Sequence, residues 1–399
     1  MKILFLSPAL PHAQAVSGLI NVNKRLTLLA ARGHEIGLAS FIQPGDERYV
    51  PELRAVARDL ELVPLPAAHS LAGDLFGLLP GTLPAPFRAW RSPAMARAVG
   101  GLVERGRYDV LVAEFAAMGQ YLYRNRHLPP VRRVVSCHSC LTTALQKAIH
   151  FQPWAWPAWR KRLQRRGLAR YEFAMYRSAD LVLTLTGEER FDLLRQAPEL
   201  RIAVVPYGVD VEHFRPREGQ AGPDTLVYTG YFAQEPNCDA VLWFARDVWP
   251  RLRARWPALR FCIVGRAPTR PIRDLAARDA RITVTGEVPD VAPFLAGACI
   301  YVCPMRMGTG FRGKVLQAMA AGLPVVATTL AAEGIPAQTG ANVILADTAH
   351  TFEEGINLLL TDPELRQRVG AQARDMVLTR FAWAHCVDLM ERALAELGD

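Results

Sequence analysis

Short runs of apolar and β-branched residues alternate with longer amphipathic segments along almost the whole chain. The runs have the length of buried strands, and the segments between them have the length and apolar spacing of helices. Two examples of the helical pattern are residues 21–31, which end before Gly33, and residues 238–255. This alternation predicts parallel sheets with helices on both faces.

The expected strands fall into two series. They are residues 2–7, 36–41, 109–113, 133–137, 181–186 and 202–206, then 225–229, 261–264, 282–285, 300–303, 324–328 and 343–346. Two series suit two doubly wound α/β domains better than one very wide sheet. Because Gly, Pro and charge cluster between the series, we predict domains 1–206 and 207–379, and a terminal helix within 380–399 at the domain junction.

Composition excludes several other architectures. Half of the 399 residues are apolar and 21% are charged, which does not suit a disordered, collagen-like or coiled-coil chain. Seven Cys do not suggest a disulfide framework. The net charge of +9 favours anionic partners. Only five basic residues are Lys, so Lys314, the single Lys of the C-terminal half, is informative.

The N-terminus imitates a secretory signal, because Lys2 precedes an apolar run. That run stops at Ser7-Pro8, short of the apolar region that a signal peptide needs. No apolar run reaches the roughly 18 residues of a membrane-spanning helix. We therefore expect a buried first strand and a cytoplasmic protein.

The densest chemical signal is residues 308–314, G-T-G-F-R-G-K, between an expected strand and an expected helix. The amides at the start of such a helix suit a phosphate. The segment matches a P-loop, but Val315 stands where the Mg²⁺-binding Ser or Thr belongs. It also matches a dinucleotide fingerprint, which normally opens the first βα unit of a domain. A tight turn without a ligand is the third interpretation, and Lys314 argues against it.

Residues 311–328 resemble the donor-binding signature of retaining glycosyltransferases of the GT4 type, which have the GT-B fold. Further segments are similar to this family in the same order: residues 205–210, 228–230, 236–237, 263–266 and 284–290. The N-terminal half matches more loosely, at Gly18, 33–35, Glu172 and 179–180. The chain is most similar to the branch associated with bacterial exopolysaccharide and exosortase loci.

The resemblance implies two Rossmann-like domains facing across a cleft. A nucleoside-diphosphate sugar would bind to the C-terminal domain, and a glycan or lipid-linked acceptor to the N-terminal one. UDP is one candidate nucleotide, and the sequence leaves the choice of base open. Basic groups and amides would neutralise the diphosphate without a metal or other cofactor. Nucleic acid is not an expected partner.

The resemblance also implies roles for particular residues. Lys314 and Arg312 would act on the diphosphate, Gly18 would let the backbone approach the phosphates, and Val288 would lie by the base. The expected donor-binding set is Gly18, Gly230, Arg266, Val288, Thr309, Gly310, Phe311, Gly313 and Gln317.

Two positions depart from the family pattern. Thr309 and Gln317 stand where the family usually carries a pair of Glu; Gln317 can still accept a ribose hydroxyl, whereas Thr309 is shorter than Glu. The usual Arg and Lys after the first strand of the second domain are also missing, and Arg312 and Lys314 are candidates to replace their charge. A weak or inactive nucleotide-sugar-binding relative, or a sugar-nucleotide epimerase on the same fold, therefore stay open as alternatives.

His138 is the catalytic candidate of the N-terminal half, because the family often places a His after this strand to contact the donor sugar; a structural His is the alternative. It lies between Cys137 and Cys140, a C-x-x-C spacing that could indicate redox or metal chemistry. Buried apolar Cys is the alternative, and we expect no metal site. Glu114 is an acceptor-side candidate, with a solvated or helix-capping Glu as the alternative.

Residues 154–170 combine Trp with a run of basic residues. The candidates for an anionic membrane surface are Trp154, Trp156, Trp159, Arg160, Lys161 and Arg165. The alternative is a long helix with core Trp and solvated Arg. A second apolar stretch, residues 75–79 through Phe87 and Trp90, could line an acceptor site.

Overall fold

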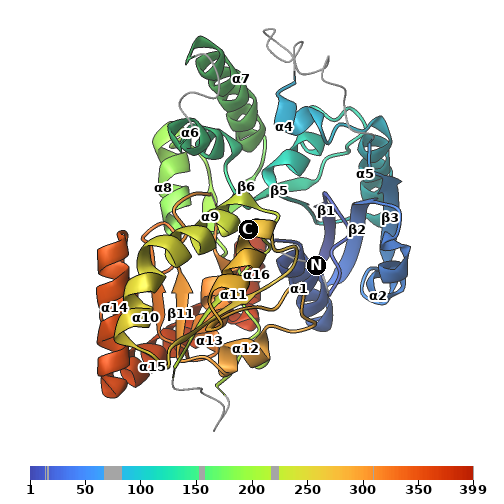
Figure 1. The fold of residues 1–399 in the computed structure, drawn as a ribbon. Helices are drawn as coiled ribbons and strands as arrows, with labels where there is room; N and C mark the ends of the chain where they lie inside the picture. Colours follow the sequence, from blue (N-terminus) through green and yellow to red (C-terminus); the bar gives the residue numbers. More distant parts are fainter. Residues whose placement is uncertain are drawn as a thin grey trace. The chain divides into compact units, whose positions relative to one another are not determined.

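The structure is a computed structural model that describes residues 1–13, 15, 18–66, 83–151, 158–216, 224–308 and 310–398, without the side chains of 147–163. The chain divides into two compact units (Figure 1). Unit 1 comprises Met1–Tyr207 and Cys386–Asp399, and unit 2 comprises Gly208–His385. The chain therefore leaves unit 1 after Tyr207 and returns to it within its last helix, α16 (Trp383–Ala395).

Unit 1 is built on a parallel sheet of seven strands in the order β3-β2-β1-β4-β5-β6-β7. The strands are β1 (Lys2–Ser7), β2 (Glu35–Ile42), β3 (Asp59–Pro64), β4 (Val110–Glu114), β5 (Arg132–Cys137), β6 (Leu181–Thr184) and β7 (Ile202–Val204). Every residue of β4 is buried, as expected for a central parallel strand covered on both faces.

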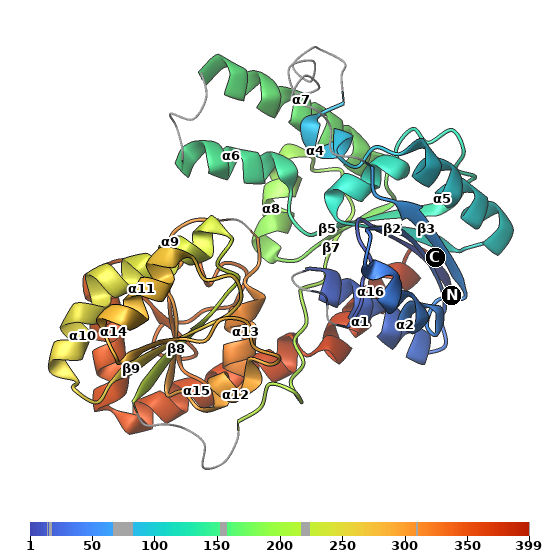
Figure 2. The same ribbon diagram turned by 45° about the vertical axis from the view of Figure 1, so that its right-hand side comes forward.

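The helices of unit 1 lie between these strands, and α6 and α7 form a pair side by side (Figure 2). They are α1 (Gly18–Ala31), α2 (Val50–Arg54), α4 (Ala85–Arg88), α5 (Pro93–Gly106), α6 (Leu141–Phe151), α7 (Ala158–Arg177) and α8 (Gly187–Gln196), with 3₁₀ turns η1 (Asp46–Tyr49) and η2 (Ala116–Tyr121). Among the residues described, none of the helices combines the length and apolar character that crossing a bilayer requires.

Unit 2 is a six-stranded parallel sheet in the order β10-β9-β8-β11-β12-β13, with helices on both faces (Figure 2). The strands are β8 (Thr225–Thr229), β9 (Arg260–Val264), β10 (Ile282–Val284), β11 (Ile300–Cys303), β12 (Val325–Ala327) and β13 (Ile344–Leu345). The helices are α9 (Glu235–Trp243), the π-turn η3 (Phe244–Val248), α10 (Trp249–Arg255), α11 (Arg270–Arg278), α12 (Ala292–Ala296), α13 (Gly313–Ala320), α14 (Ala349–Thr361) and α15 (Pro363–Arg380). The predicted fold class, two parallel α/β sheets, is confirmed.

Two details of the sequence prediction were wrong. Strand β3 was missed because it lies at the sheet edge, where D-L-E-L-V-P alternates polar and apolar residues instead of forming an apolar run. The helix predicted over 238–255 begins at Glu235 and contains the π-turn. Pro250 explains that turn, because it has no N–H to donate to the carbonyl oxygen of Arg246, and the turn before it widens.

Backbone hydrogen bonds join the loops that follow β8, β9 and β10. The Gly230 N–H donates to Val264 O (2.9 Å), and the Gly265 N–H donates to Gly286 O (3.1 Å). Gly265 has a φ of +144°, and a Cβ there would lie 1.8 Å from Gly230 O. A glycine at 265 is therefore required for these loops to approach one another at the carboxyl edge of the sheet.

We expect Gly265→Ala to lower the free energy of unfolding by about 3 kcal/mol or more, because the added methyl group collides with backbone. Gly286→Ala is the matched control, since Gly286 also has a positive φ (+72°) but nothing lies within 4 Å of its Cβ position. The control should cost only about 1–2 kcal/mol. Denaturant unfolding measures both, and equal losses would contradict the close approach.

Candidate active site

A buried polar cluster lies at the carboxyl end of the unit 1 sheet, around Glu114, the last residue of β4. Glu114 has no exposed surface. Arg25 of α1 donates through Nη1 to both Glu114 oxygens (2.9 and 3.0 Å) and to Ser136 Oγ (3.0 Å). Burial raises the pKa of Glu114, but Arg25 and the hydrogen bond from His138 outweigh burial and bring it to about 2. The ion pair therefore ties α1 to β4 and β5.

His138, in the loop after β5, stands between Glu114 and Tyr207. Its Nε2 lies 2.6 Å from Glu114 Oε2, and its Nδ1 lies 2.7 Å from Tyr207 Oη. The ring also stacks on Phe115, with centroids 3.8 Å apart. Burial lowers the pKa of His138 by more than Glu114 raises it, so the ring is neutral at neutral pH.

Gly18 opens α1 against these rings. A Cβ there would lie 2.6 Å from Tyr207 Oη, 2.7 Å from Phe115 Cζ and 2.8 Å from His138 Nδ1. The space beside Gly18 is thus filled by three side chains of unit 1, and its expected approach to a phosphate stays a prediction. Phe115 itself has a φ of +69°, a strained value that costs about 1–3 kcal/mol.

Two carboxylates anchor the loop that carries His138. Glu172 of α7, fully buried, accepts hydrogen bonds from the N–H groups of Leu141 and Thr142 (both 2.8 Å), where α6 begins. Glu189 of α8 accepts from the N–H of Cys140 (2.8 Å), and burial raises the pKa of Glu189. Negative charge is favourable at a helix N-terminus, so both carboxylates stabilise the first turn of α6 and the loop that leads into it from His138.

The two cysteines of this loop are buried. Burial raises the pKa of the Cys137 thiol, and it raises that of Cys140 to about 12, so neither is a ready nucleophile. Within the described part of the chain, no group of three or more His, Cys, Asp or Glu is arranged to hold a metal ion.

The acceptor-side prediction for Glu114 needs correction, and so does its solvated or helix-capping alternative. A side chain without exposed surface cannot contact an acceptor directly, and its oxygens bind Arg25 and His138. Arg25 was missed, although a charged residue between Val22 and Leu26 on the apolar side of a helix is a usable signal. Nothing in the sequence pattern points to Tyr207 as their partner.

In unit 2 the carboxyl edge carries Lys314, the second residue of α13. Its Nζ donates to Asn237 Oδ1 (2.5 Å), Tyr228 Oη (2.9 Å) and Thr229 O (3.0 Å). Burial lowers the pKa of Lys314 to about 8, and the nearby Arg312 acts in the same direction. The acceptors are all neutral, so the positive charge of the protonated amine is not cancelled.

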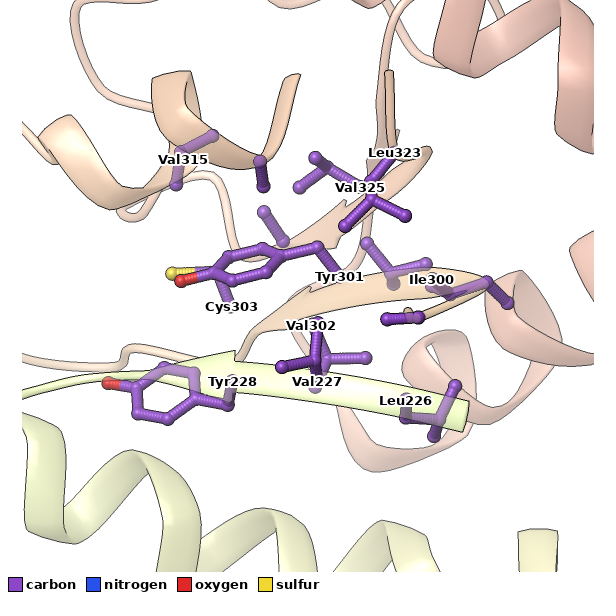
Figure 3. Close-up of a cluster of buried hydrophobic side chains, with 14 of the residues drawn as sticks. Leu226, Val227, Tyr228, Ile300, Tyr301, Val302, Cys303, Val315, Leu323 and Val325 are labelled. Carbon is purple, nitrogen blue, oxygen red and sulfur yellow. The ribbon is translucent and has the colours of Figure 1, made fainter. Parts of the chain in front are cut away.

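Two buried tyrosines from neighbouring strands lie at this end of the sheet, and Lys314 contacts one of them, Tyr228. Tyr228 of β8 and Tyr301 of β11 are fully buried and point their hydroxyl groups toward the same end of the sheet (Figure 3). Tyr228 Oη donates to Asn237 Oδ1 (2.9 Å), and Tyr301 Oη lies 2.9 Å from Thr229 Oγ1. The hydrophobic core thus ends in a polar layer, on which Lys314 is held.

The segment before α13 offers space around its backbone. Gly308 and Gly310 have φ values of +104° and +85°, and a Cβ at Gly310 or Gly313 would have nothing within 4 Å. The buried Arg312 donates to Gly310 O, and burial lowers the pKa of Arg312. Amides at the start of a helix, beside Arg and Lys, form an arrangement that suits an anion.

The remaining donor-side predictions have varied surroundings. The Gly230 N–H donates a hydrogen bond to Val264 O at the end of β9. Arg266 lies over the Tyr231 ring, with its guanidinium carbon 4.2 Å from the ring centroid. Val288, Gln317 and Phe311 are partly buried, and Phe311 lies 6.0 Å from the Phe381 ring. Thr309 is outside the described residues. The structure brings Lys314, Arg312, Gly310 and the β8 loop together in unit 2.

The membrane-surface predictions fall largely outside the description. Trp154 and Trp156 are not among the described residues, nor are the side chains of Trp159, Arg160 and Lys161, whereas Arg165 is exposed on α7. Residues 75–79 are also not described. Phe87 is fully buried against Tyr171, with ring centroids 4.6 Å apart, so it belongs to the core and does not line an acceptor site.

We expect Arg25→Met to lower the free energy of unfolding by about 3–5 kcal/mol, because it leaves the Glu114 charge buried without its partner. The double variant Arg25→Met/Glu114→Leu removes both charges and should lose clearly less than the two single variants together. Urea unfolding at pH 7 measures the set. Additive losses would show that the ion pair has no energetic coupling.

Two family models match this chain: Glycosyltransferase Family 4 over residues 26–213 and Glycosyl transferases group 1 over residues 223–362. The phosphatidyl-myo-inositol mannosyltransferase of Mycolicibacterium smegmatis is 31% identical over 193 residues, 45% of this chain and 48% of that protein. The MMP alpha-(1->4)-mannosyltransferase of Mycolicibacterium hassiacum is 25% identical over 399 residues, 93% of each chain. The chain thus spans about half the length of the first relative.

Solved structures show the same fold. Sucrose-phosphate synthase from Thermosynechococcus elongatus has a TM-score of 0.72 at 18% identity, covering 100% of this chain and 99% of that one. HepE of Anabaena, in complex with UDP, has a TM-score of 0.70 at 15% identity, covering 99% and 100%. The resemblance read from the sequence is confirmed at the level of the family, while the exopolysaccharide branch stays a prediction. The chain belongs to the GT4-type glycosyltransferases and has their GT-B fold.

Proposed function

We propose that this protein is an active, retaining hexosyltransferase that uses a nucleoside-diphosphate sugar and a glycan or lipid-linked acceptor. The observation that carries the proposal is the Lys314 cluster. An ammonium group with neutral partners, a buried Arg312 and the amide end of α13 meet at the carboxyl edge of a parallel sheet. Ligands of α/β sheets bind at this edge, and a diphosphate has the complementary charge.

The position of Lys314 supports its proposed role as a replacement cation. The family usually carries Arg and Lys in the loop after the first strand of the second domain, where this chain has residues 230–237. Lys314 contacts both ends of that segment from α13: its Nζ lies 3.0 Å from Thr229 O, at the end of β8, and 2.5 Å from Asn237 Oδ1, in the first turn of α9. This position supports the proposal that Lys314 supplies the missing charge from another element.

These groups would stabilise the charge that develops on the diphosphate as the sugar leaves it. Fixed cations and amides can do this without a divalent ion, which is why we propose a metal-independent reaction. The two relatives described above are mannosyltransferases by name, and HepE was solved with UDP. Mannose and UDP are therefore the first sugar and the first nucleotide to test.

A calorimetric panel of UDP, GDP, ADP, dTDP, NAD and ATP, each with and without Mg²⁺, tests the proposal. Metal-independent binding of one nucleoside diphosphate, followed by turnover of its sugar derivative, supports it. Preference for Mg-ATP or NAD would instead support one of the literal glycine-motif interpretations. Binding without any turnover would identify an inactive relative.

We expect nucleoside-diphosphate binding at pH 8 to take up protons, because an adjacent anion raises the pKa of Lys314 from about 8. Affinity should then fall as the pH rises above 8, where the free protein loses this proton. Lys314→Met should bind about 10- to 100-fold more weakly and show no such proton uptake. Titration calorimetry in buffers with different ionisation enthalpies measures both quantities.

Arg260→Met is the matched control, since Arg260 is exposed at the opposite, amino-terminal end of β9. It should bind nucleotide as the wild type does. Thermal unfolding of Lys314→Met, whose Tyr228 and Asn237 lose a partner, separates loss of fold from loss of binding. A folded Lys314→Met variant that binds the nucleotide with wild-type affinity would contradict the proposed location of the donor site at Lys314.

We further propose that the acceptor is lipid-linked and reached at an anionic membrane surface. From residue 115 to 179 the sequence has twelve Lys and Arg but one acid, Glu172, which is fully buried. Arg165, Arg166 and Arg170 of α7 are exposed. A surface with this charge attracts acidic lipid headgroups.

We expect replacement of Arg160, Lys161 and Arg165 by Glu to abolish sedimentation with vesicles of phosphatidylglycerol and phosphatidylcholine. Replacing Arg255, Arg260 and Arg278, three exposed residues of unit 2, by Glu changes the net charge equally and should leave sedimentation unchanged. Sedimentation that survives in the first variant leaves only the solvated-helix interpretation.

A further inference from the structure

The glycine-rich segment of unit 2, residues 306–314, is joined to α9 at its first residue. Arg306 donates two hydrogen bonds to Asp239 of α9, from Nε to Oδ2 (3.1 Å) and from Nη2 to Oδ1 (2.6 Å). Its guanidinium carbon also lies 5.1 Å from the centroid of the Trp243 ring. Asp239 and Trp243 are four residues apart, so their side chains lie on the same face of the helix. The planar guanidinium is therefore fixed in orientation as well as in position.

The last residue of the glycine-rich segment also contacts α9. Lys314 Nζ donates to Asn237 Oδ1 (2.5 Å), in the first turn of that helix. Between these two contacts Gly308 has a φ of +104°, and a Cβ there would lie 3.3 Å from Pro236 Cγ. Contacts at positions 306, 308 and 314 thus place the segment, and with it the start of α13, against α9.

Neighbouring interactions do not substitute for the ion pair between Arg306 and α9. Asp247 is already bound by Arg246 through two hydrogen bonds (2.8 and 2.7 Å). Met305, the residue before Arg306, accepts a hydrogen bond at its carbonyl oxygen from Thr328 Oγ1. That bond fixes the chain only as far as Met305. Arg306 is the residue that joins the chain beyond this point to α9.

We propose that Arg306, paired with Asp239, is a positioning residue for the donor, and that it holds the glycine-rich segment in the conformation that receives the diphosphate. The inference rests on the proposed function, because that function places the diphosphate at Lys314 and at the amides that begin α13. A segment already ordered on α9 loses little conformational entropy when the anion binds. Without the ion pair, the segment would have to become ordered during binding, and the affinity would fall.

Calorimetric titration with UDP, GDP, ADP and dTDP tests this role in binding. We expect Arg306→Met and Asp239→Ala each to bind the preferred nucleoside diphosphate about 10-fold more weakly than the wild type. The double variant should bind no more weakly than either single variant, because both substitutions remove the same contact. The two side chains are 38% and 21% exposed, and ion pairs of this kind add little to global stability, so the variants should fold.

Arg251→Met is the matched control, because it removes another ion pair of unit 2, in which Arg251 of α10 lies 3.3 Å from Glu353 of α14. This variant should bind nucleotide with wild-type affinity. Steady-state kinetics give a second readout. In Arg306→Met the KM for the nucleotide sugar should rise and kcat should change less, because the complex has the wild-type contacts once the segment is ordered. A general loss of structure would lower kcat instead.

Hydrogen–deuterium exchange, followed by mass spectrometry, tests the anchoring in the free protein. We expect peptides that cover the first turn of α13 to exchange faster in Arg306→Met and Asp239→Ala than in the wild type, because a loosened segment lets this helix end fray. Peptides of α14 should exchange as in the wild type and show that the core of unit 2 is intact. Arg251→Met should leave exchange at α13 unchanged.

Several results would overturn the inference. Wild-type affinity in both single variants, or unchanged exchange at α13, means that the ion pair does not position the segment. Tighter binding by Asp239→Ala means that Arg306 contacts the anion itself and that Asp239 competes for it. Additive losses in the double variant mean that the two side chains act separately. If the wild type binds none of the four nucleotides while exchange responds as expected, the proposed function fails and the anchoring of the segment by Arg306 stands.

Discussion

A charged group taken out of water must find hydrogen-bonding partners in the protein, and both sheet edges are organised by that requirement. In unit 1 the Glu114 carboxylate meets Arg25 and His138. In unit 2 the Lys314 ammonium meets three oxygen atoms of the β8 end and α9. Each set of contacts joins a helix to the ends of central strands, so the compensation also determines where the loops at these edges lie.

The two clusters differ in the net charge that remains once their ion pairs and hydrogen bonds have formed. The charges of Arg25 and Glu114 cancel one another. His138 beside them is neutral, and each of its ring nitrogens has a hydrogen-bonding partner. The partners of Lys314 carry no charge, so its positive potential extends beyond its hydrogen bonds. The unit 1 cluster is therefore close to electrically neutral, whereas the unit 2 cluster is suited to attract an anion.

Much of the fold was predictable, because central parallel strands are uninterrupted apolar runs. The strands at 2–7, 225–229 and 300–303 were predicted with the bounds that the structure has. Edge strand β3 was not predicted, because its polar and apolar residues alternate and it contains no apolar run. The π-turn was not predicted either, because it depends on a single missing N–H at Pro250.

The candidate site was predictable only in part. Motif spacing and resemblance to the family located Lys314, Arg312 and His138, whose positions follow from strand ends. Their partners come from elements distant in sequence: Arg25 lies 89 residues from Glu114, and Tyr207 lies 69 residues from His138. Pairing at such separation is set by the tertiary fold, which the local pattern does not encode.

The division of the chain also affects the order in which the protein can fold during synthesis. Unit 2 is continuous in sequence and is complete once residue 385 has been made, whereas unit 1 begins first and still lacks Cys386–Asp399. Those residues include Val387, Met390 and Leu394 of α16, which pack into a core of unit 1 with Ile3 and Phe5 of β1. On a ribosome, the first unit to emerge is therefore the last to close its core, and until then its apolar surface is an expected binding site for chaperones.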